Sequence, residues 1–127
     1  MSFKERAVAA GAFGAVELPK DLRYYVSPEK VGLGWHWSEP NQKPVLVGLY
    51  SESPPGQLRK GIRHILRLLR DVFRDLGHTQ VLAALDYRHP CFTRLLKSYQ
   101  KHMGFEVAGE VGNSVVLICD VDMMGRF

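Results

Sequence analysis

The fold is decided by residues 51–78, which have the sequence SESPPGQLRKGIRHILRLLRDVFRDLGH. When these residues are placed at 100° intervals, the apolar side chains fall on one arc and an arginine stripe falls on the opposite side. The apolar arc contains Ile65, Leu66, Leu68, Leu69, Val72, Phe73 and Leu76, and the arginine stripe contains Arg59, Arg63, Arg67, Arg70 and Arg74. Pro54, Pro55 and Gly56 precede the pattern and Gly77 follows it, as is typical of helix boundaries. The segment predicts an amphipathic helix over residues 57–76.

Strand-like segments precede this helix. Residues 31–37 (VGLGWHW) and 44–50 (PVLVGLY) are separated by a polar turn and predict an antiparallel hairpin. Ser2 and Glu5 have capping-box spacing, which favours a short helix over residues 3–12 and argues against a signal peptide at this position. Residues 24–27 predict one further short strand.

Segments of both kinds follow the helix. Residues 79–85 (TQVLAAL) are short and apolar nearly throughout, which predicts a central strand covered on both faces. The apolar spacing over residues 90–103 predicts a second helix. Residues 105–111 and 114–121 predict two strands joined by a Gly112–Asn113 turn, and residues 122–127 are expected to be loose. This order predicts an α/β sandwich with packed helices, a mixed, mostly antiparallel sheet and a parallel crossover around the long helix.

Composition limits the class of protein. The 127 residues are enough for one domain, residues 1–127, and the 46% hydrophobic content excludes wholesale disorder. Apolar runs are too short for a membrane helix. Two cysteines favour a reducing cytoplasm over a disulfide framework, and the five histidines lack metal-ligand spacing, so no metal is expected. The net charge of +4 is mild and is compatible with an anionic cofactor, with nucleic acid or with simple solubility.

Four segments together resemble the GNAT family of N-acetyltransferases. They are PVLVGLY (44–50), LRKGIR (58–63), VLAAL (81–85) and HMGFEV (102–107), and the resemblance covers residues 31–121. It implies a GNAT-like three-layer sandwich with an abbreviated N-terminal half. It also implies that the protein transfers an acetyl group from acetyl-CoA to a small-molecule or protein amine. In the family, the strand before the long helix binds the pantetheine arm, and a Q/R-x-x-G-x-G/A loop at the helix start binds the pyrophosphate.

The start of a helix suits a pyrophosphate on physical grounds. Its first amides lack partners within the helix, the helix dipole is positive there, and glycine allows close approach of an oxygen. In this sequence Gly61 matches the first glycine of the motif, but Leu58 and Arg63 occupy its other two specified positions. The resemblance implies the following residues for acetyl-CoA binding: Val47, Gly48, Leu49, Gln57, Arg59, Lys60, Gly61, Ile62 and Arg63.

Three residues are candidates for the chemistry. The family places a tyrosine, the general acid toward the CoA thiolate, four residues before the Gly-Phe pair; Gln100 stands there and Tyr99 is its neighbour. Tyr99 also belongs to the apolar stripe, so it is either this acid or a core residue. Glu52 and Asp86 follow strands, where a base for the amine is expected, although ordinary loop carboxylates are the alternative.

The arginine stripe leaves a non-enzymatic alternative open. It is either the solvated face of the helix, a nucleic-acid contact or a surface for an acidic partner. No aromatic residues interleave the stripe, which argues against nucleic acid. The chain also resembles compact GNAT-like proteins of tailed bacteriophages, including internal virion proteins. That resemblance implies an inert structural or interaction protein of the virion, which binds a protein through the stripe or a sheet edge.

Overall fold

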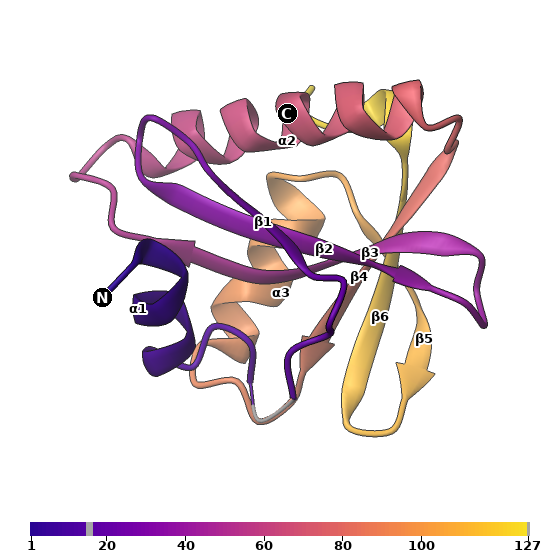
Figure 1. Ribbon diagram of the computed structural model, residues 1–127, viewed down its shortest axis with the longest axis horizontal. Helices are drawn as coiled ribbons and strands as arrows, with labels where there is room; N and C mark the ends of the chain where they lie inside the picture. Colours follow the sequence, from indigo (N-terminus) through magenta and orange to yellow (C-terminus); the bar gives the residue numbers. More distant parts are fainter. Residues whose placement is uncertain (15–16, 127) are drawn as a thin grey trace.

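The computed structural model describes residues 1–14 and 17–126. In chain order the elements are α1 (Phe3–Ala9), β1 (Arg23–Val26), β2 (Val31–Ser38), β3 (Lys43–Ser51), α2 (Leu58–Asp75), β4 (Gln80–Asp86), α3 (Phe92–Lys101), β5 (Glu106–Val111), β6 (Ser114–Asp120) and a 3-10 turn (Val121–Met123). Figure 1 shows their arrangement. Each element expected from the sequence is present, with ends that differ by a few residues.

The strands form one sheet in the order β1-β2-β3-β4-β6-β5. Neighbouring strands are antiparallel except β3 and β4, which are parallel and are connected through α2. The expected hairpin of β2 and β3, the crossover and the mixed, mostly antiparallel α/β class are therefore confirmed.

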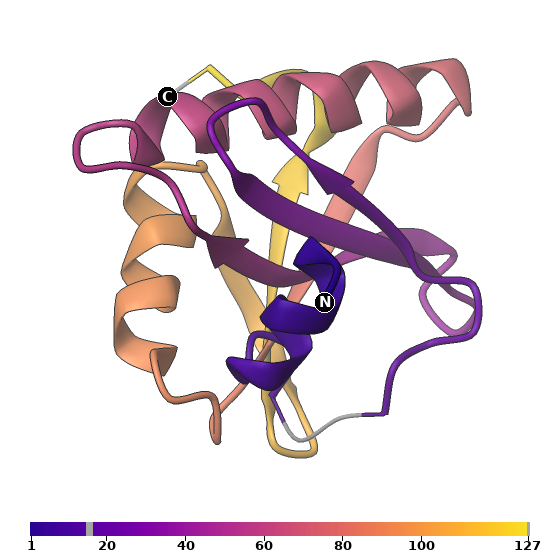
Figure 2. The ribbon, with the colours of Figure 1, turned by 60° about the vertical axis from the view of Figure 1, so that its left-hand side comes forward.

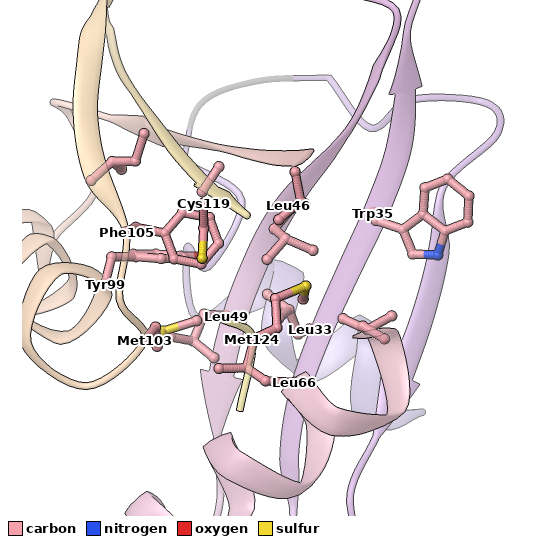
Figure 3. Packing of buried hydrophobic residues seen from close by; sticks show 14 of the residues in the cluster. Leu33, Trp35, Leu46, Leu49, Leu66, Tyr99, Met103, Phe105, Cys119 and Met124 are labelled. Atoms are coloured by element: carbon pink, nitrogen blue, oxygen red, sulfur yellow. The ribbon is translucent and has the colours of Figure 1, made fainter. Parts of the chain in front are cut away.

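Helices cover both faces of this sheet. On one face, α2 and α3 share an apolar cluster with Val81, Ala83 and Leu85, which alternate along β4. Figure 3 shows part of this cluster. On the other face, the segment that contains α1 packs closely against the sheet, because a Cβ added at Gly32 would overlap the ring of Phe3. The sheet is thus the middle layer of three.

The C-terminal segment is ordered, so the expectation that it is loose was wrong for residues 122–126; Phe127 lies outside the described residues. The side chain of Met124 is fully buried, and Figure 3 shows it beside Leu33 and Leu66. Three members of the arginine stripe donate hydrogen bonds to this segment. Arg67 Nε donates to the carbonyl of Gly125 at 3.1 Å, Arg70 donates to that of Met124 at 3.4 Å, and Arg74 Nε donates to Asp122 at 2.9 Å. The stripe is therefore not simply a solvated face.

Candidate functional site

The sheet opens between its two parallel strands. β3 and β4 are paired only at Val45 with Leu82 and at Leu46 with Ala83. Beyond these pairs β3 continues to Ser51, paired with β2, and β4 continues to Asp86, paired with β6. Figure 2 shows the two strands running apart from this point. Backbone groups along the facing edges are therefore left without a neighbouring strand.

Gly48 lies in the diverging part of β3. Its φ of 74° is in the left-handed region, which favours glycine, and a Cβ at this position would overlap the ring of Phe13. The register of the β2–β3 pair shifts between Gly32 and Gly34, opposite this part of β3. The Gly48 carbonyl accepts a hydrogen bond from the Tyr24 hydroxyl at 3.0 Å. Glycine thus permits the local bend that takes β3 away from β4.

The gap holds a cavity of about 150 Å³, here called the strand cavity. Phe13 and Leu18 line it from the N-terminal side of the sheet, whereas Leu95 and Tyr99 line it from α3. Side chains from opposite faces meet in one cavity only where the sheet is open between them. The strands themselves contribute Val47, Gly48, Leu49, Ala84, Leu85 and Asp86.

A second cavity of about 330 Å³, here called the helix cavity, lies between the end of β3 and the first turns of α2 and α3. Leu58 and Ile62 line it from α2, and Arg94 and Ser98 line it from α3. Among the described residues that line it, Arg94 alone carries a permanent positive charge. Four residues line both cavities, which therefore adjoin: Ala12, Leu49, His89 and Leu95.

The N-terminus of α2 presents free backbone donors next to the helix cavity. The first hydrogen bond within the helix runs from the Gly61 amide to the Gln57 carbonyl at 2.9 Å. The amides of Leu58, Arg59 and Lys60 precede it and have no partner within the helix. The Gln57 side chain makes no capping bond, and the first turn has no acidic residue. The local field therefore favours an anion.

Gly61 was expected to let a phosphate oxygen approach the backbone closely. In the structure it lies instead where α2 packs against β2. A Cβ at Gly61 would overlap Val31 Cγ2 and lie 3.0 Å from Glu29 Cβ, so the glycine lets α2 pack closely on β2. Its amide is bonded to Gln57 rather than available to a phosphate.

The remaining predicted cofactor residues are distributed unevenly. Val47, Gly48 and Leu49 line the strand cavity, and Leu49 and Ile62 line the helix cavity. The side chains of Gln57, Arg59, Lys60 and Arg63 line neither cavity.

Tyr99 is a core residue, as one of the two alternatives from the sequence predicts. It is 2% exposed, and its ring packs edge-on against Phe105 with centroids 5.3 Å apart (Figure 3). It also lines the strand cavity. Burial raises the pKa of Tyr99 well above its usual range, so the phenol is protonated at neutral pH.

Asp86 lies at the end of β4, and its side chain is 5% exposed and lines the strand cavity. Arg88 donates from its side chain at 2.7 and 3.0 Å and from its amide at 2.8 Å. These bonds hold the pKa of Asp86 below its usual value, so the side chain is a carboxylate of low basicity.

Glu52 lines neither cavity. It accepts two hydrogen bonds from Arg6, at 2.7 and 2.8 Å, and one from the Tyr50 hydroxyl at 3.0 Å. The Arg6 guanidinium lowers the pKa of Glu52. Its geometry is that of a link between α1 and β3.

Two residues of the site have no distinctive signal in the sequence. Arg94 is one. The other is His89. Its Nδ1 accepts a hydrogen bond from the Cys91 amide at 2.9 Å and is therefore unprotonated, and burial lowers the pKa of the ring. Both line cavities that exist only after β3, β4 and α3 are assembled. Within the described part of the chain, no helix is long and apolar enough to cross a bilayer and no group of side chains is suited to hold a metal ion.

Comparisons with known proteins support the architecture. Neither a protein-family model nor a curated protein matches the sequence. Among solved structures, the chain is similar to the crystal structure of a putative acyl-CoA N-acyltransferase from Klebsiella pneumoniae, with a TM-score of 0.57 and 12% sequence identity. The match covers 94% of this chain and 86% of the other. At this identity the likeness concerns the fold alone, and this chain has a GNAT-like fold.

Proposed function

We propose that this protein is an acyl-CoA-dependent N-acyltransferase that transfers an acetyl group from acetyl-CoA to an amine. The observation that carries the proposal is the separation of β3 from β4, which leaves two adjoining cavities beside the N-terminus of α2. An extended ligand with amide groups is suited to such a gap, because it replaces the missing strand partner.

In this proposal the pantetheine arm follows the free edge of β3 at Val47, Gly48 and Leu49. The pyrophosphate lies at the start of α2, where Leu58, Arg59 and Lys60 contribute their free amides and Arg94 adds a charge-assisted bond. Arg94 therefore supplies the positive side chain for the phosphate, since the side chains of Arg59, Lys60 and Arg63 line neither cavity. Ile62 and Leu49 form the apolar wall between the two ends.

The reaction is a direct transfer between the two bound substrates. The neutral amine nitrogen attacks the thioester carbonyl carbon, the new C–N bond forms, and the C–S bond breaks. The nitrogen gives one proton to water, and the departing thiolate takes one from the Tyr99 phenol, which solvent then restores. Tyr99 and Asp86 face the strand cavity and are therefore better placed than Glu52 to act on the reacting groups.

Isothermal titration of the full chain with acetyl-CoA tests the proposal. We expect saturable binding that Arg94→Glu weakens at least about tenfold, because a charge-assisted bond to phosphate becomes a repulsion. Lys97→Glu is the matched control, since Lys97 is exposed on the same helix and lines neither cavity. Absence of binding at millimolar acetyl-CoA rejects the function, and equal weakening by both variants rejects the position of the phosphate.

A further inference from the structure

His89 brings a polar side chain to the junction of the two cavities. Of the described residues that line both cavities, the other three, Ala12, Leu49 and Leu95, are apolar. Resting on the proposed function, we propose that His89 binds the cofactor. Its Nε2–H donates a hydrogen bond to a carbonyl oxygen of the pantetheine arm, at the point where the arm passes from the helix cavity into the strand cavity.

The backbone determines which nitrogen of the His89 ring carries the proton. Nδ1 accepts a hydrogen bond from the Cys91 amide at 2.9 Å, and a backbone amide can only donate, so Nδ1 is unprotonated. The neutral ring therefore has its proton on Nε2. Burial lowers the pKa of His89 more than the Ala12 backbone and the Asp86 carboxylate raise it, so the ring is neutral at neutral pH.

The Nε2–H group of His89 is available to a ligand. Nε2 is buried and makes no hydrogen bond to any described residue. A buried donor without an acceptor is unfavourable, and a ligand that supplies the acceptor removes this cost. The pantetheine arm contains amide carbonyl groups and must cross the junction if its two ends lie in the two cavities. The backbone of Ala12, which raises the pKa of the ring, is the competing acceptor within the chain.

The loop between β4 and α3 holds the His89 ring in place. The His89 amide donates to the Asp86 carbonyl at 3.0 Å, and Arg88 makes three hydrogen bonds to the Asp86 carboxylate. Pro90 follows with a restricted φ, and the Phe92 amide donates to the His89 carbonyl at 3.1 Å. A donor that is held before binding loses little conformational freedom when the ligand arrives. The paired Asp86 and Arg88 thus support the position of His89.

Isothermal titration of the full chain with two ligands tests the inference. The ligands are acetyl-CoA and adenosine 3′-phosphate 5′-diphosphate, its headgroup without the pantetheine arm. His89→Phe keeps a ring and removes the donor. We expect it to weaken acetyl-CoA binding about three- to tenfold, the effect of one lost hydrogen bond, and to leave headgroup binding unchanged.

Two further variants separate the hydrogen bond from the shape of the ring. His89→Gln can still donate from near the position of Nε2, so it should restore most of the affinity for acetyl-CoA. His102→Phe is the matched control. The His102 ring also has a buried nitrogen without a partner among the described residues, but it lines neither cavity, so acetyl-CoA binding should not change.

The native chain provides a test that needs no variant. In a chain labelled with ¹⁵N at histidine, saturating acetyl-CoA should shift the Nε2 and Nε2–H resonances of His89 and slow the exchange of this proton with water. Nδ1 should remain the unprotonated nitrogen, because the Cys91 amide still donates to it. The headgroup alone should leave the Nε2 resonance unchanged.

The outcomes separate this contact from the proposed function. Absence of acetyl-CoA binding by the native chain rejects the function and the contact together. If the native chain binds acetyl-CoA, the inference alone is overturned by an unchanged affinity of His89→Phe, by equal weakening of both ligands, or by an Nε2 resonance that does not move at saturation. Circular dichroism checks the fold of each variant, and the nitrogen resonances of the native chain decide if His89→Phe does not fold.

Discussion

Replacing Gly61 by alanine tests how closely α2 packs on the sheet. Alanine in place of glycine stabilises the interior of a helix by about 1 kcal/mol. The added methyl group, however, would overlap Val31 Cγ2 and crowd Glu29 Cβ at 3.0 Å. Val31 is fully buried and β-branched, so its side chain has little freedom to move away. Overpacking of a core costs about 1–3 kcal/mol, and two close contacts place this site at the upper end.

We therefore expect Gly61→Ala to lower the free energy of unfolding by about 2 kcal/mol, since the overpacking exceeds the helix-propensity gain. Urea denaturation measures this change. In a Val31→Ala background the overlap with Cγ2 is removed while the contact with Glu29 Cβ at 3.0 Å remains, so Gly61→Ala should destabilise the protein by about 1 kcal/mol less than in the native chain. Acetyl-CoA binding should not change, because Gly61 lines neither cavity. A gain of about 1 kcal/mol in the otherwise native chain would refute the packing described here.

Two further changes test other contacts of the fold. Met124→Ala should lower the free energy of unfolding by about 2–4 kcal/mol in urea denaturation, because the side chain is fully buried; a loss below about 1 kcal/mol would show that the C-terminal segment is not docked on α2. Glu52→Gln should reduce the acid sensitivity of the protein. Arg6 lowers the pKa of Glu52 in the folded state. The ionised Glu52 side chain therefore stabilises the fold above its unfolded pKa of about 4.3, and this stabilisation is lost as the pH falls through the lower folded pKa. Thermal unfolding from pH 7 to pH 2 should show the native chain and the variant converging at low pH, and a constant difference would contradict the ion pair.

The secondary structure and the order of elements were predictable because their signals are local. Residues 57–76 have a helical period of apolar side chains, with proline before the helix and glycine after it. Both signals depend only on residues that are close together in the sequence. The docking of Met124 was missed because the last residues carry no periodic pattern, and only the assembled arginine stripe gives them a partner.

The packing role of Gly61 was not predicted, although a signal for it was present. Gly61 is four residues before Ile65 and so lies on the apolar arc of the helix, which packs on the sheet. The motif match directed attention to phosphate binding instead. Asp86, His89 and Tyr99, in contrast, come from β4, the loop after it and α3. Their meeting at one cavity depends on where β3 and β4 part, which no spacing in the sequence encodes.

The central claim is that an acyl-CoA occupies the gap between β3 and β4. The most direct measurement is a titration of the isotope-labelled chain with acetyl-CoA, followed through the backbone amide resonances. The claim predicts saturable shifts at Val47, Gly48 and Leu49 and at Leu58, Arg59 and Lys60, while the amides of β5 stay unchanged. Spectra without shifts at millimolar acetyl-CoA, or with shifts only outside these two segments, would contradict it.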